Sequence, residues 1–106
     1  MKTLEEALLL LQRIHGLVES LALAAKSRQP TMPFVINIRR TLPTLAANLK
    51  SQFGLIADQV TTLNLAASRG SSESVRLRTL REGVAQLKQA LEIAVTQTKQ
   101  KHSAEV

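Results

Sequence analysis

His15 is the residue of this chain best suited to proton or phosphoryl transfer, because imidazole alone titrates unperturbed near neutral pH. A heptad count from Leu4 places His15 on the apolar seam of a predicted N-terminal helix. Among the residues that follow it, only Glu19, one turn on, could hold the second ring nitrogen. A histidine at the border of a core is the commoner case. We therefore predict a structural role for His15, with a phospho-acceptor in a phosphorelay-type helical bundle as the less favoured alternative.

The remaining residues form no pattern typical of an enzyme or a metal centre. The chain has no cysteine, and its two histidines, at positions 15 and 102, are far apart with no acids at ligand spacing. The four glycines are scattered rather than gathered in a phosphate loop, and no serine has a nucleophile-elbow setting. The sequence predicts no catalytic residue, no metal and no cofactor, and we expect a protein that is not an enzyme.

The basic residues are the second candidate for function. The formal net charge is +6, which makes nucleic acid, an acidic protein or an anionic membrane a plausible partner. Only two aromatic residues are present, which argues against binding single strands by base stacking. On an up-down-up arrangement of three helices, six basic residues fall at one end and form a predicted basic pole: Lys26, Arg28, Arg39, Arg40, Lys99 and Lys101. A nucleic-acid-associated protein is the first alternative, against the plainer reading of a solvated surface.

The first predicted helix covers about residues 4–27. Thr3 and Glu6 have the spacing of a capping box, and the apolar stripe is wide enough to touch two neighbouring helices. Leu9, Gly16 and Leu23 lie on the otherwise polar face. They are a candidate interface with a second subunit, or two isolated exposed leucines, which are common.

The second predicted helix covers about residues 33–68, after a break that contains Pro30 and Pro33. Pro43 lies inside it, and we expect a kink or short break near residues 40–42, with Thr41 as the cap of the second piece. One apolar seam runs through the whole helix, with an irregular step of four at its fifth member: Ile38, Leu42, Leu45, Leu49, Phe53, Ile56, Val60, Leu63 and Ala67.

The third predicted helix covers about residues 72–100, and residues 101–106 are expected to form a loose tail. Gly70 suits the cap that ends the helix before it, and Ser71 or Ser72 suits the N-cap. The seam recurs at spacings of three and four: Leu77, Leu80, Val84, Leu87, Leu91 and Ala94. The three glycines expected inside helices, at positions 16, 54 and 83, indicate close helix approach.

Together these patterns predict one all-α domain over residues 1–106, an up-down-up bundle of three long helices that dimerises into a larger bundle. The function predicted is a non-enzymatic helical protein-interaction and assembly module, acting as a homodimer. The longest unbroken apolar run is Ala7 to Leu11, so we expect no membrane span. Because there is no cysteine and no signal-peptide pattern, we expect a cytoplasmic location.

Overall fold

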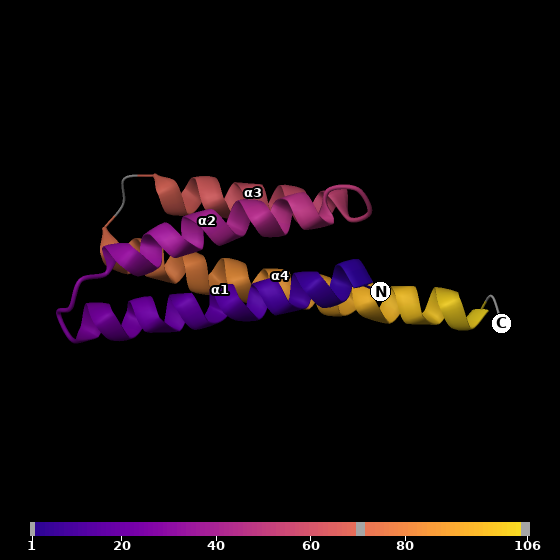
Figure 1. The fold of residues 1–106 in the computed structure, drawn as a ribbon, viewed down its shortest axis with the longest axis horizontal. Coiled ribbons are helices and arrows are strands. Elements are labelled where there is room, and N and C mark those ends of the chain that lie inside the picture. The colour runs from indigo at the N-terminus through magenta and orange to yellow at the C-terminus, as the bar shows by residue number, and fades with distance from the viewer. Residues whose placement is uncertain (1, 70–71, 105–106) are drawn as a thin grey trace.

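The computed structural model describes residues 2–69 and 72–104, with side chains for residues 3–69 and 72–100. Regular structure in this part of the chain is entirely helical (Figure 1). The helices are α1 (Lys2–Lys26), α2 (Met32–Leu49), α3 (Gly54–Ser68) and α4 (Glu73–Ala104). The all-α prediction is confirmed. The prediction of three long helices is wrong in count, because residues 33–68 fold into two helices.

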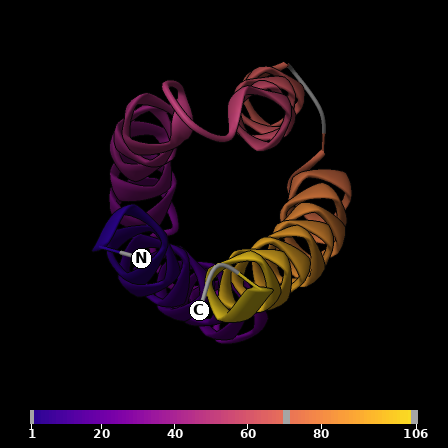
Figure 2. The same ribbon diagram turned by 90° about the vertical axis from the view of Figure 1, so that its right-hand side faces the viewer.

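Each helix runs antiparallel to the one before it, so the topology is up-down-up-down (Figure 1). Viewed end-on, the helices form a ring in which α1 and α3 each pack against both α2 and α4 (Figure 2). The wide stripe of α1 does therefore face two neighbours, as predicted. Because the second predicted helix folds back on itself, α4 runs parallel to α2, and the end of α4 lies where α1 begins.

The core lies along the axis of the ring. Its members follow the predicted seams, at spacings of three and four, and each is at most 7% exposed. The most deeply buried side chains are Leu4, Ile14, Val18, Leu21, Ile38, Leu42, Leu45, Leu49, Val60, Leu80, Leu87 and Leu91. Leucine, isoleucine and valine thus hold the bundle together by burial of apolar surface.

The C-terminus of α1 ends in a Schellman motif. The N–H of Gln29 donates to the carbonyl of Ala24 at 2.8 Å, and the N–H of Arg28 donates to the carbonyl of Ala25 at 3.3 Å. Arg28 has φ 57°, in the left-handed region that glycine adopts at lower cost. An arginine therefore stands where helices usually end in glycine.

Serine caps the start of α4 as predicted. The hydroxyl of Ser72 accepts a hydrogen bond from the N–H of Val75 at 3.3 Å. The predicted cap at Gly70 and the alternative cap Ser71 lie outside the described residues. At its other end α4 stays helical to Ala104, so the helix is longer than predicted, while residues 105–106 lie outside the description.

Pro43 does not break α2, which runs through it from Met32 to Leu49. Thr41 is buried inside the helix and donates its hydroxyl to the carbonyl of Asn37 at 2.7 Å, so it is not a cap. Of the two outcomes expected near residues 40–42, a kink or a short break, the short break is wrong, because the helix is continuous. Pro43 itself is exposed, so the ring sits on the solvent side, where water can satisfy the carbonyl that loses its N–H partner.

The chain turns instead at residues 50–53, between α2 and α3. Lys50 keeps helical angles (φ −56°, ψ −39°), whereas Phe53 departs from them (φ −133°, ψ 55°). Helix-like hydrogen bonds flank the departure, from Phe53 N–H to the Leu49 carbonyl at 2.8 Å and from Ala57 N–H to the Phe53 carbonyl at 2.9 Å. These two bonds keep the i to i−4 spacing on either side of the reversal.

One of the three helical glycines marks a close approach. A Cβ added at Gly83 would fall on the methyl groups of Leu63, so α4 lies close against α3 there and a larger residue would require that side chain to move. A Cβ added at Gly16 or Gly54 would meet nothing within 4 Å. The prediction of close approach is thus confirmed for Gly83 and wrong for the other two.

Within the described residues, Thr3–Lys26 is long and apolar enough to cross a membrane by length and composition. From the longest unbroken apolar run alone, we expected no segment able to cross a membrane. That expectation was too strict. The core helix of a soluble bundle passes the same test, and α1 packs one face against α2 and α4. The finding is weak evidence for a membrane span.

Candidate interaction surface

Helix α3 has an unusual surface for a helix packed on one side only. Of its 15 residues only Asp58 is charged. Its exposed face carries Asp58, uncharged polar residues and two leucines, Leu55 (82% exposed) and Leu65 (57% exposed). The outer face of α3 therefore carries little charge and two leucines in contact with solvent.

The core-facing side of α3 also has small side chains, because alanine occupies two of its four buried positions, Ala57 and Ala67. Small side chains leave space along the line where α3 meets α4. Two hollows open there, one near the α2–α3 turn and one beside Leu63 and Gly83.

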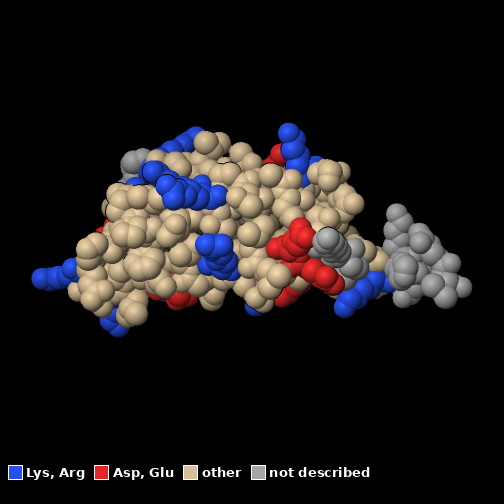
Figure 3. All heavy atoms as spheres, viewed as in Figure 1, with Lys and Arg blue, Asp and Glu red and all other residues tan. Residues whose placement is uncertain are grey.

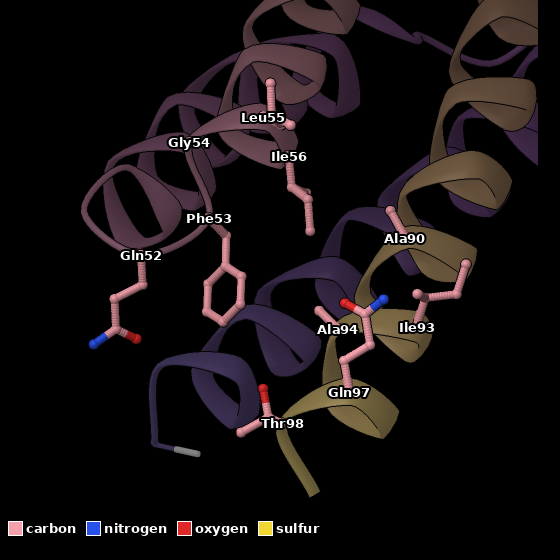
Figure 4. A pocket seen from close by; sticks show the side chains of 10 residues that line it. All are labelled: Gln52, Phe53, Gly54, Leu55, Ile56, Ala90, Ile93, Ala94, Gln97 and Thr98. Atoms are coloured by element: carbon pink, nitrogen blue, oxygen red, sulfur yellow. The ribbon is translucent and has the colours of Figure 1, made fainter. Parts of the chain in front are cut away.

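The hollow near the turn is an apolar groove of about 570 Å³ between α3 and α4. Figure 4 shows Phe53 and Ile56 pointing into the space from the α3 side, with Ala90 and Ala94 on the α4 side. Leu55 and Ile93, the latter 57% exposed, stand at its rim. The polar members of its lining are amides and a hydroxyl, and none is charged: Gln52, Gln97 and Thr98. We call this groove, lined by residues 52–56, Ala90, Ile93, Ala94, Gln97 and Thr98, the turn groove. A groove of this kind suits apolar side chains.

The sequence prediction missed the turn groove. It placed Phe53 and Ile56 on a core seam, whereas both are only partly buried. The available signal was the near absence of charge over residues 54–68, in a chain with 14 Lys and Arg and 8 Asp and Glu.

The predicted interface residues of α1 lie on its outer face. Leu9 and Leu23 are each 66% exposed, and Gly16 lies between them with open space around it. The two leucines are 14 positions apart, so they do not form one continuous apolar patch.

His15 lies on the surface, and its predicted place on the apolar seam is wrong. Ile14 and Val18 hold the core positions, and His15, the next residue after Ile14, points out of the core. It lines another groove, of about 680 Å³, between α1 and α4. Charged side chains also line that groove, including Lys88 and the ion pair of Arg81 Nη2 with Glu19 Oε2 at 3.3 Å.

The structure does not form the predicted basic pole. Lys26, Arg28, Arg39 and Arg40 lie toward the end where α1 finishes, whereas Lys99 lies at the opposite end, in the last turns of α4 (Figure 1). Lys101 follows Lys99 in α4, but its side chain lies outside the description. The cause is the turn at residues 50–53, which reverses α4 relative to the three-helix arrangement. Figure 3 shows mostly Lys and Arg over the first of these ends and both signs of charge near the other.

Part of this basic surface is bound to the fold itself. Arg39 donates from Nη2 to the carbonyl of Ser68 at 3.1 Å, and Arg76 donates from Nε to the carbonyl of Ala67 at 3.2 Å. Both carbonyls lie at the C-terminus of α3, where the helix dipole favours positive charge. These two arginines thus stabilise the end of α3.

The described residues contain no group of three or more His, Asp or Glu side chains that could hold a metal ion. Searches of protein-family models, curated proteins and solved structures found no match for this chain.

Proposed function

We propose that this protein is a non-enzymatic helical protein-interaction and assembly module that acts as a cytoplasmic homodimer. The observation that carries the proposal is the uncharged, apolar turn groove, with Leu55 82% exposed beside Ile93. Exposed leucine is common when isolated, but here it borders a hollow lined by further apolar side chains.

A second copy of this chain is the partner that fits the groove. No charge lines the groove, so electrostatics do not favour an acidic or a basic partner. A symmetric dimer apposes the same patch on both subunits. If two turn grooves pack against each other, one contact covers Leu55 and Ile93 of both copies. A different protein bound to the groove would cover these residues in one copy only.

Sedimentation at several micromolar and at submicromolar concentrations tests the proposal. We expect the wild type to form a dimer. The double variant Leu55→Gln/Ile93→Gln should raise the dissociation constant of this dimer at least ten-fold, because two apolar contacts per subunit are lost. Leu65→Gln is the matched control, since Leu65 is an exposed leucine of the same helix outside the turn groove. A compact monomer at every concentration would refute the homodimer.

The interface predicted from sequence is tested in the same assay. Leu9→Gln/Leu23→Gln removes the exposed leucines of α1 and leaves the turn groove intact. If this variant dissociates and the turn-groove variant does not, the dimer uses α1 instead.

Phosphotransfer through His15 is a second candidate, because the ring lies exposed in a groove that also holds two cations, Arg81 and Lys88, and two acids, Glu19 and Glu92. Of the two cations, Lys88 is the one without an ion pair in the described residues and could attract a phosphoryl group. Incubation with a phosphodonor should give acid-labile phosphate on the wild type and none on His15→Ala. Equal labelling of both proteins would remove this candidate.

Nucleic-acid binding has less support, because the six residues proposed for it lie at two ends of the bundle and Arg39 binds the end of α3. A binding assay with random duplex DNA and RNA tests whether the remaining basic residues bind nucleic acid. It compares the wild type with Arg28→Glu/Arg40→Glu at low and at moderate salt. Equal, negligible binding by both would exclude it.

A further inference from the structure

The turn between α2 and α3 keeps part of the helical pattern on either side of the reversal. Lys50 is helical, the flanking hydrogen bonds keep the i to i−4 pattern, and the backbone departs clearly at Phe53. No side chain caps α3, and residues 50–53 contain no glycine or proline that would enforce a reversal. The packing of α3 and α4 on the rest of the bundle, together with Phe53 against the core, therefore holds the turn.

The apolar seam also continues through the turn. Leu42, Leu49, Ile56 and Leu63 recur at a spacing of seven, which places them on one face if α2 and α3 join into a single helix. In the closed bundle the other three are buried, whereas Ile56 is only partly buried. On a joined helix Ile56 would fall on the same face as these three buried residues.

We propose that two copies of this chain exchange their α3–α4 hairpins, with residues 50–53 straightening so that α2 and α3 form one helix. The inference rests on the proposed homodimer and specifies how it forms. The hairpin of each copy packs on α1 and α2 of the other, so every contact between the two halves of the bundle is made again between chains.

Two features of the closed bundle favour this exchange. The turn groove lies at the turn, so it would face the second copy across the two-fold axis, and Leu55 and Phe53 would be covered there. Helix α4 also runs past the turn: Gln97 and Thr98 line the groove, and residues 99–104 extend beyond it (Figure 1). In the exchanged dimer that extension lies beside the other half of the assembly instead of projecting into solvent.

Cross-linking distinguishes an exchanged dimer from two closed bundles in contact. The chain has no cysteine, so introduced thiols are the sole targets of a short bifunctional maleimide. Glu19→Cys/Arg81→Cys replaces an ion pair between α1 and α4, on opposite sides of the turn. Glu6→Cys/Asn48→Cys replaces a 3.1 Å hydrogen bond between α1 and α2, on the same side of the turn, and is the matched control.

After refolding at high concentration, the dimer fraction of the first variant should give covalent dimers on a denaturing gel, while the control pair should give linked monomers. The single variants Glu19→Cys and Arg81→Cys should give no covalent dimer. A dimer in which both pairs link within one chain would overturn the exchange and leave the homodimer standing. Monomers at every concentration would overturn both.

A pair of glycine substitutions tests the hinge independently. Gly54 begins α3 in the closed bundle but would be interior in the joined helix, and a Cβ there meets nothing within 4 Å. Gly54→Ala should therefore favour the dimer, by up to about five-fold per hinge. Gly16→Ala, equally open but interior in both forms, should leave the monomer–dimer equilibrium unchanged. An equal effect of the two variants would contradict a hinge at residues 50–53.

Discussion

Replacement of Gly83 by alanine tests the closest approach between α3 and α4. The added Cβ would fall on the side chain of Leu63, so this side chain or the helix axis must move. Overpacking of this kind costs roughly 1–3 kcal/mol, while removing glycine from a helix interior returns about 1 kcal/mol. We expect the free energy of unfolding to fall by about 1 kcal/mol, from the difference of these two effects.

Gly16→Ala is the matched control, because its Cβ meets nothing within 4 Å and only the helix-propensity gain of about 1 kcal/mol remains. Urea unfolding followed by far-ultraviolet circular dichroism measures both variants, since the described fold is helical and its loss is easily seen. The control should be stabilised and Gly83→Ala destabilised.

The double variant Gly83→Ala/Leu63→Ala shows whether the two residues compete for one space. Leu63→Ala alone should cost about 2–5 kcal/mol because Leu63 is buried. In the double variant the new methyl fills part of the vacated volume, so the loss should be smaller than the sum of the single losses by roughly 0.5–3 kcal/mol. Additive losses, or a Gly83→Ala variant as stable as the Gly16→Ala control, would refute the close approach.

Three further substitutions test the helix ends and the internal proline, each by urea unfolding. Arg28→Gly should raise the free energy of unfolding by about 1 kcal/mol, because φ is 57° at that position, whereas Arg28→Ala should not raise it. Pro43→Ala should raise it by roughly 1–3 kcal/mol, since it restores an N–H donor to the carbonyl of Arg39 in an unbroken helix; a loss of stability would contradict this. Arg76→Ala should lower the free energy of unfolding by about 0.5–1.5 kcal/mol, because the hydrogen bond to the end of α3 is lost. Arg40→Ala should have a smaller effect, because Arg40 is exposed and makes no side-chain hydrogen bond in the described residues.

The seams were predictable because the pattern of leucine, isoleucine and valine depends only on helix geometry. Leu45, Leu49 and Leu91 were each placed on a seam and are each fully buried. His15 was misplaced because a strict spacing of seven drifts relative to a real helix, and Ile14 and Val18 fill the core on either side of it.

The turn at residues 50–53 was not predictable from local sequence. Pro43 carries the strongest breaking signal in this region, yet it lies on the solvent side of α2 and the helix continues through it. The segment Lys50 to Phe53 carries no such signal, and its reversal depends on α3 and α4 packing against α1 and α2. The misplaced basic pole follows from this one error, since the reversal moves Lys99 to the other end.

The position of Phe53 makes the turn groove accessible to spectroscopy. The chain contains neither tryptophan nor tyrosine, so its near-ultraviolet absorption is weak and it has no strong intrinsic fluorophore. A tryptophan at position 53 would be the sole emitter in the protein and would sit half-covered in the groove beside the hinge. Its emission wavelength would report directly whether water or a second subunit lies over that site.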